Sequence, residues 1–267
     1  MYPDIPSVRE RVRASRPLIH CITNPISINQ CANTVLAAGA RPIMAEHPRE
    51  AAEITSSASA LMLNLGNITD ARMESMRIAA KTACEHGIPV VLDLVGISCS
   101  SMRREYAGEL LAEAPAAVIK GNYSEVYALS EDTYRTAGVD AEETVSEDMI
   151  IRGIRGQAEK YHCTVLASGK KDIISDGSRT LIIDNGSPQL AAVTGTGCML
   201  GALCAAYVSA GKTQALEAAA AACAVLGIAG EKAETTLGSG TFMVRLFDQL
   251  SVLTDETIET KLRLTEV

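Results

Sequence analysis

The chain has 267 residues, 47% of them hydrophobic, so it can bury a substantial core within one domain spanning residues 1–267. Aromatic residues make up only 3% of the chain and Trp is absent, which argues against a stacking surface for single-stranded nucleic acid. The 24 basic and 32 acidic residues give a net charge of -8 without a cluster of Lys and Arg, which disfavours nucleic acid and other polyanions as partners.

The first 17 residues are charged and lack the apolar centre of a secretory signal, so we expect a cytoplasmic protein. The eight cysteines are scattered without a CxxC pair, which favours free buried thiols over disulfides or a zinc site. The uncharged stretch 191–211 is as long as a membrane span, but its content of Gly, Ala, Thr and Ser favours a buried helix. We therefore expect no membrane association.

Short β-branched runs bounded by Pro, Gly or Asn alternate with amphipathic segments along the first two thirds of the chain. The runs predict strands at 18–21, 42–44, 60–63, 90–92, 117–120 and 164–167. The amphipathic segments predict helices at 29–38, 49–56, 71–86, 101–111 and 147–161. This alternation predicts an α/β fold, with a mostly parallel central β-sheet flanked by helices on both faces in three αβα layers.

Two later runs, 172–175 and 180–184, flank the turn Asp176-Gly177 and predict a β-hairpin, because Gly accepts positive φ. An antiparallel edge on the parallel sheet follows. From residue 197 to residue 250 the pattern is helical throughout.

Residues 193–200, VTGTGCML, place a glycine-rich turn directly before a long apolar helix. The unpaired N–H groups and the dipole at such a helix start can hold an anion. A plain helix start, with Thr as its cap and Gly for close packing, explains the same residues equally well. The segment does not match the GxGxxG dinucleotide motif, because Leu200 occupies the last glycine position.

Two predicted strands end in polar residues that suit a metal site. Asn122 and Glu125 follow the strand that ends at Lys120, and would project into the cleft where open α/β sheets bind ligands. A capping pair at a helix start explains Asn122 and Glu125 as well, and taken alone is the simpler interpretation. Asp93 ends another run, where its carboxylate can hold Mg2+ or its waters, or cap the following loop.

Taken in chain order, these segments resemble the hydroxyethylthiazole kinase family of the ribokinase-like superfamily over about residues 17–250. The segments that carry the resemblance are 17–24 (PLIHCITN), 32–33 (AN), 39–45 (GARPIMA), 64–66 (NLG), 93–96 (DLVG), 121–125 (GNYSE), 193–198 (VTGTGC) and 238–242 (GSGTF). The resemblance implies a kinase that uses ATP and Mg2+ to phosphorylate the primary alcohol of 4-methyl-5-(2-hydroxyethyl)thiazole, in thiamin biosynthesis or salvage. It also implies a homotrimer with pockets at the subunit interfaces.

The resemblance assigns a role to each matched position of the site. The substrate contacts are Asn24, Met44 and Gly195; the nucleotide contacts are Lys120 and Ser168; the metal site is Asp93, Asn122 and Glu125; the anion hole is Gly195, Thr196, Gly197 and Cys198. Cys198 stands where sugar kinases of the superfamily carry an Asp base. Its thiol, at a helix N-terminus that tends to lower the pKa, is therefore the candidate catalytic base.

Three residues depart from the family pattern: Lys120 replaces Arg, Ser168 replaces Thr, and Leu94 replaces Pro. Lys keeps the cation but loses bidentate phosphate geometry, and Leu94 puts the shape of the turn after Asp93 in question. A related kinase acting on hydroxymethylpyrimidine or pyridoxine is the nearest alternative. A hydrolase with Cys198 as nucleophile lacks a histidine placed to activate it, and a nucleotide-binding regulator without turnover is the third alternative.

Overall fold

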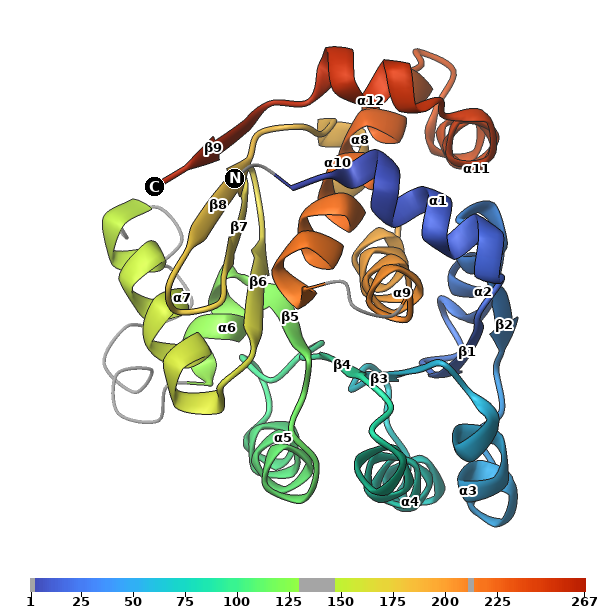
Figure 1. Ribbon diagram of the computed structural model, residues 1–267, viewed down its shortest axis with the longest axis vertical. Helices are drawn as coiled ribbons and strands as arrows, with labels where there is room; N and C mark the ends of the chain where they lie inside the picture. Colours follow the sequence, from blue (N-terminus) through green and yellow to red (C-terminus); the bar gives the residue numbers. More distant parts are fainter. Residues whose placement is uncertain (1–2, 130–146, 211–213) are drawn as a thin grey trace.

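A single sheet with strand order β2-β1-β3-β4-β5-β6-β7-β8-β9 runs through the computed structural model (Figure 1). The structure describes residues 3–129, 147–210 and 214–267. The strands are β1 (Leu18–Ile22), β2 (Arg41–Ile43), β3 (Ala60–Asn64), β4 (Val90–Asp93), β5 (Val118–Asn122), β6 (Thr164–Ser168), β7 (Asp172–Ser175), β8 (Thr180–Ile183) and β9 (Leu264–Glu266).

Strands β1 to β6 are parallel, and β7, β8 and β9 continue the sheet as antiparallel strands. The six parallel strands and the hairpin expected from the sequence are thus confirmed. Strand β9 was not expected, because its residues alternate without a buried apolar run and it pairs with β8 at the edge of the sheet.

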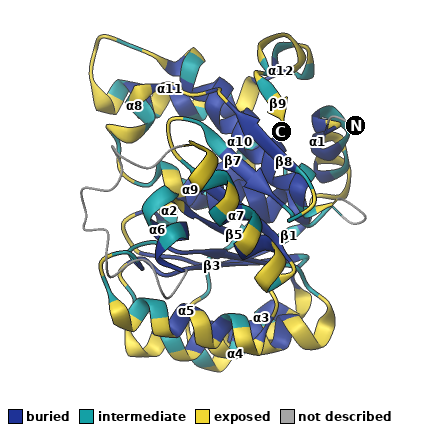
Figure 2. Ribbon diagram, turned by 90° about the vertical axis from the view of Figure 1, so that its left-hand side faces the viewer, coloured by how far each residue is buried: buried dark blue, intermediate teal, exposed yellow. Residues whose placement is uncertain are grey.

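One face of the sheet is covered by helices that follow the parallel strands: α3 (Pro48–Ser57), α4 (Asp70–His86), α5 (Ser101–Glu113), α6 (Tyr123–Ala128) and α7 (Glu147–Tyr161). Their inward residues form one apolar cluster with the strands, including Met76, Tyr106 and Ile154. The outer faces of α3, α4 and α5 are exposed (Figure 2), as expected for amphipathic helices.

The other helices form the second layer around a separate apolar cluster. They are α1 (Ile5–Ser15), α2 (Ile28–Ala37), α8 (Pro188–Ala191), α9 (Thr196–Val208), α10 (Ala215–Ala233), α11 (Ser239–Val252) and α12 (Asp255–Lys261). Helices α9 and α10 are buried nearly all round, which their Ala and Gly content allows because small residues let backbones approach (Figure 2). The three-layer αβα prediction is therefore confirmed.

Helix α1 was not predicted from the charged N-terminal sequence. Asp4 caps it by accepting the N–H of Ser7, and its apolar stripe of Ile5, Val8 and Val12 is buried. All eight cysteines are free as expected, but Cys84 and Cys99 are exposed instead of buried. Among the described residues, no helix combines the length and apolar character needed to cross a bilayer.

Candidate active site

The polar strand ends lie next to one another because of the sheet register. Asn64 of β3 pairs with Asp93 of β4, and Asp93 pairs with Lys120 of β5. Paired residues on adjacent strands project to the same face of a sheet, so the three side chains form a row. Helix α9 packs on this face. Gly201 of α9 makes room for the row, since a Cβ there would lie 3.3 Å from Asp93 Oδ2.

A cavity of about 330 Å³ opens at this edge of the sheet. Its walls come from the ends of the parallel strands and the start of α9: Asn24, Ile26, Ser27, Gly66, Asn67, Val95, Arg103, Lys120, Asn122, Glu125, Ser168, Thr194, Gly195, Gly197 and Cys198. Of the site residues expected from the sequence, Met44, Asp93 and Thr196 are not on these walls. The fold thus gathers the rest of the predicted set from distant segments into one cavity.

The glycine-rich turn forms an open helix N-terminus. Gly195 is the N-cap of α9 with φ of 93°, a conformation that L side chains rarely adopt. No side chain caps this helix, so its first backbone N–H groups are available to an anion. The Thr196 hydroxyl instead donates to the carbonyl of Leu190 at 2.8 Å, which ties the turn to α8. This geometry supports the anion-hole interpretation over a plain helix start.

Lys120 brings a positive charge to the same place. It is almost completely buried, its Nζ lies 3.0 Å from Asp93 Oδ1, and a Cβ at Gly197 would lie 3.3 Å from that Nζ. Burial raises the pKa of Asp93 to about 6, although the positive charge of Lys120 acts to lower it. Burial alone would lower the pKa of Lys120, but the charges of Asp93 and Glu125 raise it above its ordinary value. Lys120 therefore stays charged beside the start of α9.

Cys198 lies in the first turn of α9 with its sulfur facing two amides. Asn24 Nδ2 and Asn64 Nδ2 lie 3.4 Å and 3.3 Å from its Sγ. Burial, together with the charge of Asp93, raises the pKa of the Cys198 thiol. The expectation of a lowered pKa is wrong, because desolvation and the Asp93 carboxylate outweigh the charge of Lys120 and the hydrogen bonds of Ser27 and Asn24, which lower this pKa.

Asn122 and Glu125 form a capping box at the start of α6. Asn122 Oδ1 accepts the Glu125 N–H at 2.8 Å, and Glu125 Oε2 accepts the Asn122 N–H at 2.8 Å. Glu125 Oε1 also accepts the N–H of Gly96 at 2.8 Å, which joins α6 to the turn after β4. The capping interpretation is confirmed, and both residues also face the cavity.

The residues at this edge fit Mg2+ only with help from other ligands. No group of three or more His, Cys, Asp or Glu side chains suited to hold a metal ion occurs within residues 3–129, 147–210 and 214–267. Mg2+ commonly binds one or two carboxylates and keeps waters and substrate phosphates as its other ligands. The Glu125 carboxylate on the cavity wall would provide one such ligand, and Asp93, which is not on the wall, would add its negative charge nearby.

The turn after β4 is well formed despite Leu94. The Leu94 N–H donates to the Lys120 carbonyl at 2.8 Å, a bond that a Pro could not make, and Ile97 N–H donates to the Leu94 carbonyl at 3.1 Å. Gly96, with φ of 79°, supplies the positive φ that this turn requires. The departure at Leu94 therefore leaves Asp93 in place.

Arg103, Ser27 and Asn64 are among the residues in or beside the cavity that were not assigned a role from the sequence. Arg103 of α5 donates to the Val95 carbonyl at 3.2 Å over the Gly96 turn, and Ser27 precedes α2. Asn64 was recognised only as part of a turn motif, yet it contacts Asp93 and Cys198. The position of Asn64 beside Asp93 follows from the register between β3 and β4, which the sequence does not show.

Met44 follows β2 and is partly buried against the second-layer cluster, away from the cavity walls. Strand β1 holds this segment through His20, whose Nε2 donates to the Ala45 carbonyl at 2.9 Å. Its Nδ1 lies 2.9 Å from the Thr55 hydroxyl. The assignment of Met44 to the substrate pocket stays a prediction.

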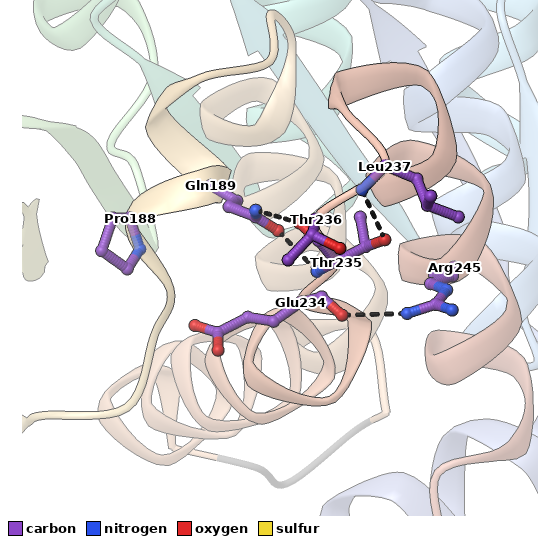
Figure 3. A pocket seen from close by; sticks show the side chains of 7 residues that line it. All are labelled: Pro188, Gln189, Glu234, Thr235, Thr236, Leu237 and Arg245. Carbon is purple, nitrogen blue, oxygen red and sulfur yellow. Dashed lines mark hydrogen bonds between the residues drawn. The ribbon is translucent and has the colours of Figure 1, made fainter.

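A second groove, of about 730 Å³, lies between α8 and the α10–α11 connection (Figure 3). Gln189 Nε2 donates to the Thr235 carbonyl at 2.6 Å, and Thr235 N–H donates back to Gln189 Oε1 at 3.1 Å. Arg245 Nη1 donates to the Glu234 carbonyl at 3.0 Å. These polar groups already have partners within the wall, and none of the predicted site residues lines this groove.

A helix N-terminus, a buried cation and two carboxylates at the end of a parallel sheet make a site suited to binding phosphates and to transferring a phosphoryl group. The sequence matches the hydroxyethylthiazole kinase family over residues 10–256. It is 46% identical to hydroxyethylthiazole kinase 2 of Clostridium botulinum over 96% of this chain and 98% of that protein. It is 43% identical to the hydroxyethylthiazole kinase of Alkaliphilus metalliredigens over 93% of this chain and 92% of that protein.

Solved structures agree with this assignment. The hydroxyethylthiazole kinase of Pyrococcus horikoshii OT3 superposes with a TM-score of 0.89 at 36% identity, covering 98% of both chains. The pyridoxal kinase of Staphylococcus aureus, at 15% identity, shares the fold with a TM-score of 0.65 over 94% of this chain and 98% of that chain. The chain belongs to the hydroxyethylthiazole kinase family, and it is a kinase with the ribokinase-like fold.

Proposed function

We propose that the protein transfers the γ-phosphoryl group of ATP to the primary alcohol of 4-methyl-5-(2-hydroxyethyl)thiazole and so supplies the thiazole phosphate for thiamin biosynthesis or salvage. The observation that carries this proposal is the uncapped start of α9 beside Lys120, at a cavity that Cys198 also lines. Family membership supports the choice of substrate.

The phosphates bind at the start of α9 in this proposal. The N–H groups of Gly195, Thr196, Gly197 and Cys198 face the transferring phosphoryl group, where they neutralise charge that spreads over its oxygens. Lys120 adds a point charge to the phosphates, held in place by Asp93 at 3.0 Å. Ser168, whose hydroxyl donates to the Gly121 carbonyl at 3.3 Å, borders the nucleotide at the end of β6.

Asp93, Asn122 and Glu125 would hold Mg2+ largely through water. When bound, Mg2+ supplies positive charge that bridges and neutralises the nucleotide phosphates. Both oxygens of Asp93 already have partners, Lys120 and Asn64, so Asp93 suits an outer position better than direct coordination. Glu125 is fixed by two backbone N–H groups, which pre-organises its carboxylate at the cavity wall.

Cys198 is the base in this proposal. As the alcohol oxygen bonds to phosphorus and the bond to the ADP oxygen breaks, the alcohol proton passes to the Cys198 thiolate, which becomes a thiol, and ADP leaves. A thiol with a raised pKa is ionised in only a small fraction of molecules, but its thiolate is a stronger base than that of a thiol with an ordinary pKa. Phosphoryl transfer needs little base assistance in a loose transition state, so weak catalysis by Cys198 suffices.

Asn24, Met44 and Gly195 are the proposed thiazole contacts, and Asn24 lies beside the Cys198 sulfur at 3.4 Å. The active form is a cytoplasmic homotrimer in this proposal, by resemblance to the family.

The test is direct detection of thiazole phosphate. Purified protein is incubated with hydroxyethylthiazole and ATP, with Mg2+ or with EDTA, and the product is read by mass spectrometry together with ADP. We expect one ADP for each thiazole phosphate, and no product with EDTA. ATP binding without any product in the presence of Mg2+ would contradict the proposal and favour a regulator without turnover.

A further inference from the structure

Asn64, the last residue of β3, is completely buried and contacts four groups of the site. Its Oδ1 accepts the backbone N–H of Gly66 at 2.9 Å and Asn24 Nδ2 at 3.0 Å. Its Nδ2 donates to Asp93 Oδ2 at 2.8 Å and lies 3.3 Å from Cys198 Sγ. One side chain therefore touches the proposed substrate contact, the carboxylate and the thiol.

The backbone contact fixes the orientation of this amide. A backbone N–H can only donate, so the Asn64 oxygen must face Gly66. The Nδ2 group then faces Asp93 and Cys198, and its two hydrogens are enough for both. An amide turned the other way would place an oxygen against the carboxylate and a donor against the Gly66 N–H.

The remainder of β3 shows that a polar side chain is not needed to form this strand. Residues 60–63 of β3 are apolar and buried, and Asn64 pairs with β4 through its backbone. A buried amide is costly unless its hydrogen bonds are made. Each hydrogen bond of the Asn64 side chain goes to the site or to the turn that follows β3.

We infer that Asn64 is a positioning residue for phosphoryl transfer, which holds the Asp93 carboxylate against Lys120 and directs the Cys198 sulfur toward the cavity. Asp93 uses one oxygen for Lys120 and the other for Asn64, so both ends of the carboxylate are fixed. This inference rests on the proposed function, and it assigns Asn64 an effect on turnover rather than on substrate binding.

The test compares Asn64→Ala and Asn64→Asp with wild type, using hydroxyethylthiazole and MgATP. Asn64→Asp keeps the shape and both acceptor contacts but loses both donors. Asn185→Ala is the matched control, because Asn185 is another buried amide with hydrogen bonds to Glu231, Lys261 and Arg263, none of which lines the cavity. Thermal unfolding of each protein is recorded alongside.

We expect Asn64→Ala to lower kcat by about tenfold or more, while KM for ATP and for the thiazole changes less than about threefold. Asn64→Asp should show the same loss, so the inference can be tested even if the alanine variant does not fold. Asn185→Ala should lose thermal stability but keep kcat within about twofold. Because Asn64 acts partly through Cys198, Asn64→Ala should cost less in a Cys198→Ala background than in wild type.

A folded Asn64 variant with kcat within about twofold of wild type would overturn the inference, as would equal losses in Asn64→Ala and Asn185→Ala. Wild-type protein that makes no thiazole phosphate would instead refute the proposed function. Whether Asn64 positions the Cys198 thiol is then decided by alkylation of Cys198 with iodoacetamide, followed by peptide mass spectrometry. We expect alkylation about fivefold slower in Asn64→Ala and unchanged in Asn185→Ala, and equal rates in all three proteins would overturn the inference.

Discussion

At the scale of single residues, the buried pair of Asp93 and Lys120 joins stability to function. Both side chains are withdrawn from water, and each neutralises the other at 3.0 Å. Removing one partner of such a pair leaves an uncompensated buried charge, which costs about 3–5 kcal/mol. The pair therefore has to be tested by changing both residues as well as each one alone.

Lys120→Met should lower the free energy of unfolding by about 3–5 kcal/mol, because it leaves the Asp93 carboxylate buried without its cation. Lys120→Met combined with Asp93→Asn should recover most of this loss, since no charge is then left unpaired. Urea unfolding monitored by circular dichroism gives the free energy of unfolding of wild type, Lys120→Met, Asp93→Asn and the double variant. Losses that simply add in the double variant would show that the two side chains are energetically independent.

Cys198→Ala should fold normally and lower kcat, because little volume is lost and the proposed base is removed. Cys198→Asp should retain activity or raise it, because a carboxylate restores the base of the sugar kinases. Steady-state phosphorylation of hydroxyethylthiazole measures both, with Cys204→Ala, a buried thiol on the same helix, as the matched control. If Cys198→Ala turns over as fast as wild type, Cys198 only fills space. A well-folded but inactive Cys198→Asp beside an active Cys198→Ala would indicate charge repulsion at the anion site.

At the scale of elements, the start of α6 has a structural and a catalytic role. Glu125 caps the helix, holds the Gly96 turn and faces the cavity. Glu125→Gln keeps the shape of the side chain and removes its charge. We expect it to lower kcat about tenfold or more and to raise the Mg2+ concentration needed for half-maximal rate, with a stability loss of about 1 kcal/mol.

Thr69→Ala is the control for capping alone, because Thr69 caps α4 by accepting the Arg72 N–H at 3.3 Å and does not line the cavity. It should lose similar stability and keep both kcat and the Mg2+ dependence. An unchanged Mg2+ dependence in Glu125→Gln would remove Glu125 from the metal site.

Glu231 of α10 anchors the connection into β9. Its Oε1 accepts from Arg263 Nη2 at 2.6 Å, from Asn185 Nδ2 at 3.0 Å and from the Gly186 N–H at 3.0 Å. Burial alone would raise the pKa of Glu231, but these hydrogen bonds outweigh it and lower the pKa below its ordinary value of 4.5. The stability that Glu231 contributes is thus present above pH 4.5 and is lost as pH falls through the lower folded value.

Glu231→Gln should therefore cost about 1–2 kcal/mol of unfolding free energy at neutral pH, and this difference from wild type should narrow below the ordinary pKa of Glu. Urea unfolding at a series of pH values measures both effects. Glu266→Gln is the control, because Glu266 pairs with Arg179 at the surface and should cost less. If the difference in unfolding free energy between wild type and Glu231→Gln stays constant with pH, the charge of Glu231 contributes nothing to stability.

The sequence predicted the elements better than their contacts. Each parallel strand and the hairpin could be predicted, because buried apolar runs are short and bounded by turn residues. Helix α6 was not among the predicted helices, although the capping pair at its start was recognised, and β9 forms only by pairing at the sheet edge. The pairing of Asp93 with Lys120 depends on the register between β4 and β5, which residue patterns do not specify.

At the scale of the whole molecule, two apolar clusters on opposite faces of one sheet hold the strand ends in a fixed row. The cavity volume of about 330 Å³ is small compared with the combined size of a nucleotide and a thiazole. The exposed Ile26 is one of the residues that line the cavity. The single domain over residues 1–267 and the homotrimer stay predictions. The family resemblance predicted most of the cavity walls, whereas Met44 lies elsewhere in the described chain.

The central claim is that this kinase acts on a thiazole alcohol. The most direct test compares kcat/KM for this alcohol with kcat/KM for the alcohols considered as substrates of related kinases. Hydroxyethylthiazole, hydroxymethylpyrimidine, pyridoxine and pyridoxal are each assayed with MgATP, and each phosphorylated product is quantified by mass spectrometry. Substrate choice is a ratio of kcat/KM values, so all four are measured with the same enzyme preparation. We predict that hydroxyethylthiazole is preferred by about a hundredfold or more. Equal or greater kcat/KM for the pyrimidine or either pyridine alcohol would contradict the account.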